Sequence, residues 1–221
     1  MVAAAMLLTG CNSMTNTGKG ALIGGGSGAA VGAGIGALIG GGKGAGIGAA
    51  IGTAVGAGAG TLIGNRMDKQ KKELEKSLAN ADVETVQDQN GLAAIKVTFP
   101  GGILFPTNGT TLSASAQTEL AQFAASLKQN PETNVQIFGF TDNTGGMEVN
   151  TRIANGRALS VDRFLVDSGI APTRLSYQGI PMADYVASND TPAGRAQNRR
   201  VEIYITANQQ MIQQAEQGTL K

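Results

Sequence analysis

The chain has 221 residues, enough for one ordinary domain with additional segments or for two small domains. Its formal net charge is +1 and its basic residues are spread along the sequence, which argues against a nucleic-acid partner. Histidine is absent and cysteine occurs once, so the commonest general base, an intramolecular disulfide and a multi-cysteine metal site are excluded. We therefore expect neither a metal nor another cofactor.

The first ten residues are an apolar run that ends in small residues directly before Cys11. This pattern is typical of a processing segment, although the Lys or Arg that normally opens a secretory signal is missing. The stretch Leu8-Thr9-Gly10-Cys11 resembles the lipobox of bacterial lipoproteins, in which the signal (here residues 1–10) is removed and the cysteine carries the acyl chains. We expect residues 11–19 to be a lipidated linker; the alternative is a chance buried cysteine. Asn12 stands where an aspartate favours inner-membrane retention in the enteric system, so the outer membrane is favoured.

Residues 20–64 carry a glycine at every fourth position, twelve in all, and 20 of the 33 glycines lie between Gly18 and Gly64. A spacing of four would place these glycines in a ridge along one face of a helix, where another backbone can approach closely. The segment is also a tandem repeat, because residues 18–40 align with residues 42–64 at 16 of 23 positions. Residues 20–42 and 44–64 carry no charge, and each half is about 21 residues long, or ~32 Å as a helix, which matches the thickness of a bilayer core.

We interpret this segment as a glycine-zipper hairpin of two packed helices that associates with a membrane. In water so much glycine makes a poor helix, whereas unsatisfied backbone groups are costly in a bilayer. The alternative is a flexible Gly/Ala linker, but a linker needs neither the strict period nor the interspersed Leu, Ile and Val. Self-association through the glycine faces is left open.

Two polar segments flank the remaining sequence. Residues 65–82 interleave acidic and basic side chains, which predicts a solvated helix acting as a charged spacer. Residues 208–221 are glutamine-rich and predict a polar tail that is frayed or disordered.

Residues 83–207 predict a single α/β (α+β) domain, a mixed β-sheet with helices packed on one face. Alternating segments on either side of Gln89-Asn90-Gly91 predict a hairpin. Helical periodicity marks 112–128 and Met147–Asp167, and alternation marks three further strands. The expected strands are 83–87, 92–99, 134–140, 174–179 and 200–206.

One helix of this domain carries polar residues on its apolar face. On a helical projection of Met147–Asp167, Asn150 and Arg157 fall within the stripe formed by Ile153, Val161 and Leu165. A guanidinium that faces a sheet is costly unless it is paired. The preceding strand delivers Asp142 to the same end of the sheet, so we expect Asp142 beside Arg157. An acid and a base held together suit a zwitterionic ligand, since arginine binds carboxylate and aspartate accepts from ammonium. A self-satisfied structural salt bridge is the alternative.

The motifs TDNTGG, GRALSV and GRAQNRRVEI resemble the OmpA-like peptidoglycan-associated domain over about residues 90–205. With the lipobox and the glycine repeat, the whole chain resembles the YiaD-like outer-membrane lipoproteins. The resemblance implies non-covalent binding of the meso-diaminopimelate of the peptidoglycan stem peptide. It assigns that binding to Asp142 and Arg157, with Thr141, Asn150 and Arg200 as neighbouring contacts.

The same resemblance places Asn198 and Arg199 beside the site or in its supporting shell, and for Arg195 and Arg199 we favour a structural role. Two positions depart from the family pattern. Phe140 stands where the family often has histidine, and Pro106 where it commonly has aspartate. Both departures bear on affinity and ligand choice rather than on the pair Asp142 and Arg157.

These observations favour a non-catalytic tether in the outer membrane. Its partners would be peptidoglycan, through the periplasmic C-terminal domain, and membrane lipid, through acylated Cys11 and the zipper hairpin. An enzyme is disfavoured because the single well-placed carboxyl, Asp142, faces an arginine that keeps it ionised and a poor acid. The alternative function is a membrane-assembly or pore-like protein built on the zipper, with the C-terminal domain as a wall-targeting module.

Overall fold

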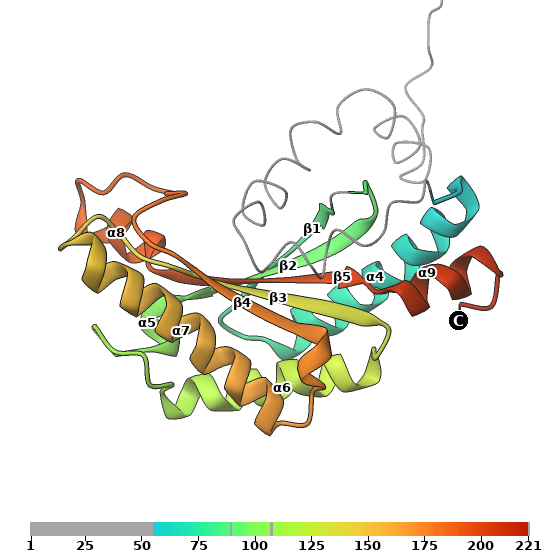
Figure 1. Cartoon of the computed structure of the whole chain (residues 1–221), viewed down its shortest axis with the longest axis horizontal. Helices are drawn as coiled ribbons and strands as arrows, with labels where there is room; N and C mark the ends of the chain where they lie inside the picture. The colour runs from blue at the N-terminus through green and yellow to red at the C-terminus, as the bar shows by residue number, and fades with distance from the viewer. Residues whose placement is uncertain (1–54, 89, 107, 221) are drawn as a thin grey trace, which may run out of the picture.

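The computed structural model describes residues 55–88, 90–106 and 108–220. Cys11 and residues 20–54 of the predicted zipper lie outside the described residues. The centre of the fold is a five-stranded mixed sheet with the order β1-β2-β5-β3-β4 (Figure 1). The strands are β1 (Asp82–Gln87), β2 (Ala93–Pro100), β3 (Thr133–Phe140), β4 (Leu175–Ile180) and β5 (Arg200–Ala207). The helices are α4 (Ala57–Ser77), α5 (Gly101–Leu104), α6 (Ala114–Gln129), α7 (Met147–Asp167), the 3₁₀ turn η1 (Pro172–Arg174), α8 (Pro192–Asn198) and α9 (Gln209–Glu216).

The sheet is antiparallel except at one edge. β1 and β2 form the predicted hairpin, and its turn is stabilised by Asp88, whose Oδ1 accepts from the backbone amides of Asn90 and Leu92. Gly91 provides the positive φ of +74° that this turn requires. β5, the last strand in the sequence, lies in the middle, antiparallel to both β2 and β3. β4 runs parallel to β3, because α7 connects them as a crossover.

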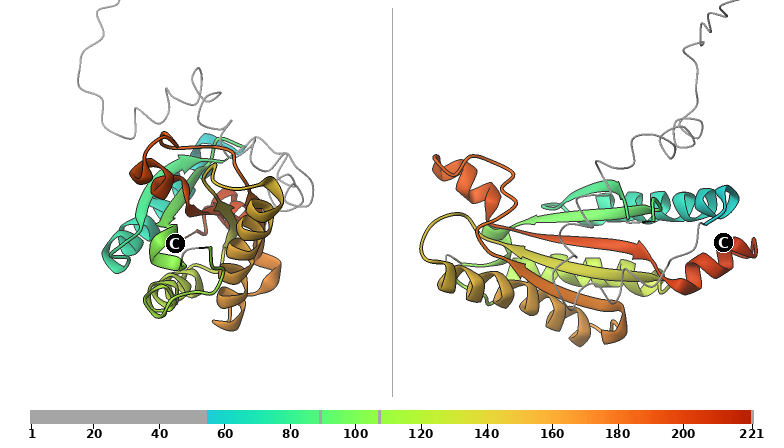
Figure 2. Two further views of the ribbon diagram at one scale, coloured as in Figure 1. Left: turned by 90° about the vertical axis from the view of Figure 1, so that its left-hand side faces the viewer. Right: turned by 45° about the horizontal axis from the view of Figure 1, so that its top comes forward.

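The two faces of the sheet differ, as the alternating sequence predicts. One face packs beneath α4, α6 and α7 and forms the main core (Figure 2). Its strand residues alternate along β2, β3 and β5: Ile95, Val97, Phe99, Val135, Ile137, Val201, Ile203 and Ile205. The other face carries a smaller cluster of Phe138, Phe140 and Tyr204. The expected fold class, a mixed sheet with helices packed on one face, is confirmed.

Helix α4 corrects the expectation of a solvated spacer. The segment is helical, but Ile63, Met67 and Leu74 are fully buried in the main core, and Gln70 is 1% exposed. The apolar positions recur every three or four residues, so they form a stripe along a helix whose other face is charged. α4 therefore belongs to the folded domain. It also includes residues 57–64 of the second glycine repeat, with Ala59 buried against the same core. Among the described residues, the helices are each too short or too polar to cross a bilayer.

The C-terminal segment is likewise ordered rather than frayed. Residues 209–216 form α9, capped by the Asn208 side chain, which accepts from the Met211 amide. Met211, Ile212 and Ala215 are buried, and α9 packs against α4. The sequence analysis missed this amphipathic helix because the segment is mostly glutamine. Three apolar residues are nevertheless enough to bury one face of so short a helix.

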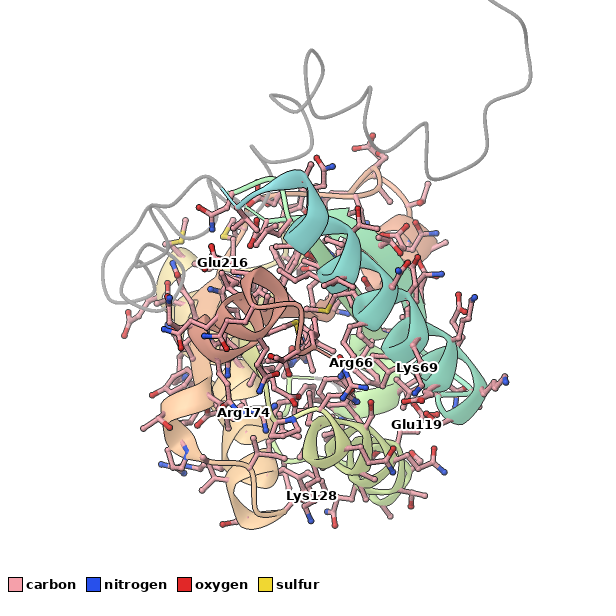
Figure 3. All side chains as sticks on the ribbon, turned by 90° about the vertical axis from the view of Figure 1, so that its right-hand side faces the viewer. Arg66, Lys69, Glu119, Lys128, Arg174 and Glu216 are labelled. Carbon is pink, nitrogen blue, oxygen red and sulfur yellow. The ribbon has the colours of Figure 1, made fainter. Side chains whose placement is uncertain are left out.

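Arg174 stabilises the end of the molecule where β3 and β4 begin (Figure 3). Its guanidinium donates to the backbone carbonyl oxygens of Leu127, Asn130 and Thr133 at 2.7–3.0 Å. These carbonyls include the unpaired ones that end α6, so Arg174 satisfies acceptors that the helix cannot satisfy itself. This arginine fixes α6 to the sheet and plays no part at the opposite end, where the candidate site lies.

Candidate functional site

The site is built on the loop from β3 to α7, residues 141–146, at the carboxyl end of β3. Gly145 has a φ of +88°, a conformation that favours glycine, and it lets the chain turn sharply into α7. Asn150, one turn into α7 and 4% exposed, donates from Nδ2 to the carbonyl oxygens of Thr144 and Gly146 at 2.9 and 3.1 Å. Asn150 therefore holds the loop against the helix and lines the pocket described below.

Asp142 is a nearly buried carboxylate at the start of this loop, 5% exposed. Its Oδ1 accepts from the Thr144 backbone amide at 2.8 Å, and its Oδ2 pairs with Nη1 of Arg199 at 2.6 Å. Burial alone would raise the pKa of Asp142. The hydrogen bond from Thr144 and the ion pair with Arg199 outweigh burial, so the pKa lies below its ordinary value. Asp142 is therefore ionised at neutral pH.

Arg157 reaches the same place from the buried face of α7, where it is 4% exposed. Its Nε donates to the carbonyl oxygen of Gly109 at 3.0 Å, and its guanidinium carbon lies 5.3 Å from the centre of the Phe105 ring. Burial, followed by the nearby charge of Arg199, lowers the pKa of Arg157, whereas Asp142 raises it. An arginine nevertheless stays protonated in a protein, so Arg157 presents a buried positive charge.

These side chains line one pocket of about 540 Å³, a size typical of small-ligand sites. Asp142, Arg157, Thr141 and Asn150, four of the five binding residues predicted from the sequence, are all among its walls. Asp142 and Arg157 both line this pocket, and the ion pair of Asp142 is made with Arg199, which the sequence analysis did not pair with it. The remaining wall residues are Asn108, Thr144, Gly145, Val149, Arg152, Ile153, Arg195 and Arg199.

Arg200 lies outside this pocket, contrary to its predicted place beside Asp142. Arg200 is the first residue of β5. Like Glu202 and Tyr204, it lies on the face of the sheet opposite the helices, and it is 4% exposed. Its Nε donates to Glu202 at 2.6 Å, and its guanidinium carbon lies 3.8 Å from the centre of the Phe140 ring. The hydroxyl of Tyr204 donates a hydrogen bond to Glu202, and burial, followed by the Glu202 carboxylate, raises the pKa of Tyr204. Arg200 is therefore part of a satisfied structural network.

The two departures from the family pattern have different consequences. Phe140 is buried beneath Arg200 on the face away from the helices. Pro106 instead supports the pocket, because its carbonyl oxygen accepts from the Gly109 amide at 2.9 Å and thereby shapes the turn that presents Gly109 to Arg157. Thr141 also has a supporting contact, since its Oγ1 accepts from the Met182 amide at 3.1 Å.

Arg195 and Arg199, for which the sequence analysis favoured a structural role, line the pocket. Arg152, which the sequence analysis did not single out, also lines it. The sequence held one signal for this outcome. Alternation along residues 200–206 puts Arg200 on the face opposite Val201 and Ile203. Of the two consecutive arginines, Arg199 is therefore the one available to the pocket.

The pocket carries an excess of positive charge. Four arginines face it (Arg152, Arg157, Arg195 and Arg199) against the single carboxylate of Asp142. A ligand with carboxylate groups would relieve this imbalance, and an ammonium group would find its acceptor in Asp142. Within the described ranges, acidic side chains do not gather in groups of three that could hold a metal ion.

Comparisons with known proteins match two parts of the chain. Residues 104–199 match the OmpA family, and residues 1–68 match the YMGG-like Gly-zipper. The chain is 36% identical to "Probable lipoprotein YiaD" of Escherichia coli over 65% of this chain and 64% of that protein. It is 38% identical to "Peptidoglycan-binding protein ArfA" of Mycobacterium bovis over 51% of this chain and 35% of that protein. The chain thus spans less than two thirds of the length of these relatives.

A solved structure gives the same fold. The cell wall anchor of the T6SS from Pseudomonas aeruginosa is 26% identical, with a TM-score of 0.54 over 65% of this chain and 98% of that chain. Its coverage indicates that the shared unit is the folded domain described above.

Proposed function

We propose that this chain is a non-catalytic outer-membrane lipoprotein that binds the cell wall, because residues 104–199 match the OmpA family. Its C-terminal domain lies in the periplasm and grips the diaminopimelate of peptidoglycan stem peptides without breaking a bond. The observation that carries this proposal is the pocket in which the carboxylate of Asp142 and the guanidinium of Arg157 face one ligand-sized space.

The chemistry of diaminopimelate matches these two groups. Each end of this amino acid carries an ammonium and a carboxylate, and one end stays free when the other is joined into the peptide. The ammonium would donate to Asp142, which is ionised, and the carboxylate would accept from Arg157. Arg157 bonds to the protein through Nε. The two Nη groups form the planar edge that binds a carboxylate in a bidentate manner.

A binding role also agrees with the protonation state of Asp142. An acid catalyst needs a pKa near the working pH, which enzymes reach by raising the pKa of a carboxyl. The pKa of Asp142 is instead lowered by its hydrogen bond and its ion pair. The site therefore supports holding a charged ligand rather than donating a proton to it.

We further propose that the chain is attached to the membrane chiefly through acyl chains on Cys11. Residues 57–64 of the second glycine repeat belong to α4, where Ala59 and Ile63 are buried in the domain. The uncharged remainder of that repeat, residues 44–56, would measure only about 20 Å as a helix, whereas a bilayer core is about 30 Å thick. While α4 stays docked, this repeat is too short to cross as one helix, which favours the acyl anchor over a spanning hairpin.

The test of the proposed function is competition on isolated peptidoglycan sacculi with the purified full-length chain. We expect the chain to pellet with sacculi and to be released by free meso-diaminopimelate at millimolar concentration. Cadaverine, the diamine that remains when both carboxylates of diaminopimelate are removed, is the matched competitor and should release less protein, because it offers no carboxylate to Arg157. Equal release by cadaverine, or no pelleting at all, would contradict diaminopimelate recognition.

A further inference from the structure

Arg199 differs from the other arginines of the pocket in being fixed at its backbone and free at its side chain. Its carbonyl oxygen accepts from the Gly101 amide at 2.7 Å, and it caps the end of α8 immediately before β5 begins. Its side chain is nevertheless 41% exposed, and its one described hydrogen bond runs to Asp142. The guanidinium can therefore leave Asp142 without disturbing the fold.

The contact that Arg199 makes is the one an ammonium ligand would need. Asp142 accepts from the Thr144 amide through Oδ1, so Oδ2 is its outward acceptor, and Nη1 of Arg199 occupies it at 2.6 Å. A ligand ammonium and this guanidinium are both cationic donors for the same oxygen. Because the two cations repel each other at one acceptor, the ammonium binds Oδ2 at the expense of the guanidinium.

From this geometry we infer that Arg199 is an internal competitor that closes the Asp142 subsite in the empty pocket and is displaced by the ammonium group of the ligand. The inference rests on the proposed function, because it assigns the ammonium of the wall peptide to Asp142. It makes Arg199 a specificity residue: a ligand that carries an ammonium group can exchange with Arg199 at Asp142, whereas a ligand with carboxylates alone has no group that can take this position.

Arg157 cannot play this part. It is buried on α7, it is held by Gly109 and the Phe105 ring, and its own pKa is lowered first by burial and then by the charge of Arg199. The pair Arg199 and Asp142 is more exposed on the arginine side, and ion pairs of this kind contribute little net stability. The free energy needed to break this ion pair is therefore small enough to be offset by the binding of a ligand.

The experiment compares the full-length wild type with Arg199→Gln, using two probes, meso-diaminopimelate and pimelate. Pimelate has the same seven-carbon chain and two carboxylates but no ammonium group. We expect Arg199→Gln to bind diaminopimelate about fivefold more tightly, the factor corresponding to loss of a partly exposed ion pair. Pimelate should not gain, so the ratio of the two affinities rises. Titration calorimetry measures both.

Two further variants complete the design. Arg199→Lys keeps a cation that can pair with Asp142 and should restore the wild-type ratio. Arg163→Gln removes an exposed arginine farther along α7 and should leave both affinities unchanged. If Arg199→Gln binds diaminopimelate no better or more weakly, or improves both probes equally, the inference is overturned. Failure of the wild type to bind diaminopimelate would instead overturn the proposed function, so the two failures are distinguishable.

Discussion

Replacing Arg157 by glutamine is expected to weaken the binding of meso-diaminopimelate about 100-fold. Arg157 is 4% exposed, and the position of its guanidinium beside Phe105 and Gly109 leaves the outer edge of that group for a carboxylate. Losing one partner of a desolvated charged contact costs about 3 kcal/mol, because the ligand carboxylate is then buried without the guanidinium that pairs with it. Titration calorimetry of the purified full-length chain measures the change.

The control for this prediction lies on the same helix. Arg163→Gln makes the identical chemical change at an exposed position and should bind like the wild type. Circular dichroism should show both variants folded. Arg157 donates one side-chain hydrogen bond to the protein, and the burial of its charge opposes the stability that this bond provides. Binding by Arg157→Gln within a few-fold of wild type would remove Arg157 from the site.

The second large effect concerns the packing that places α7 on the sheet. Gly139 on β3 lies so close to α7 that an added Cβ would overlap the backbone carbonyl oxygen of Ala154, and Gly179 on β4 meets the same turn of α7. Gly139→Ala is therefore expected to lower the free energy of unfolding by about 3 kcal/mol, the upper range for overpacking a core. Urea denaturation measures the change.

Gly102→Ala is the matched control, because an added Cβ there meets nothing within 4 Å. It should change the free energy of unfolding by less than about 0.5 kcal/mol. Comparable stability of the two variants would show that α7 can move away from β3 at no cost. In that case the placement of Asn150 and Arg157 would not depend on this close contact.

Most of the sheet could be predicted because alternation is a local signal. The strands of the hairpin, β3 and β5 alternate between residues of the main core and residues of the opposite face, and this pattern is visible in the sequence. The stripe of α7 was equally clear, and it placed the buried Arg157 correctly on the inner face. A polar residue inside an apolar stripe was thus the most informative feature of the sequence.

The packing of α4 and α9 could not be read in the same way. In α4 the buried residues Met67, Gln70 and Leu74 stand among charges, and the stripe begins with Ala59 and Ile63 inside the glycine repeat. The change in composition near residue 65 suggested a boundary between two segments, but α4 runs through this position without a break. Burial of these residues depends on α6, α9 and the sheet, and contacts between distant segments leave no local pattern.

The partner of Asp142 was missed for a related reason. Spacing placed Asp142 and Arg157 at one end of the sheet, and both line the pocket. The position of Arg199 depends on β5 lying beside β3, a pairing between segments 60 residues apart that the sequence order does not specify. Phase along β5 could have assigned Arg200 to the opposite face, but the choice of Asp142's partner required the fold.

Co-sedimentation of the full-length chain with isolated sacculi, comparing wild type with Asp142→Asn, tests whether the carboxylate of Asp142 holds the protein on peptidoglycan. Asparagine keeps the shape of the side chain and an oxygen for the Thr144 amide, but it removes the charge that would hold an ammonium group. Asp162→Asn, farther along α7, is the control. We predict that wild type and Asp162→Asn pellet while Asp142→Asn stays folded in the supernatant. Equal pelleting of all three proteins would contradict the assigned site.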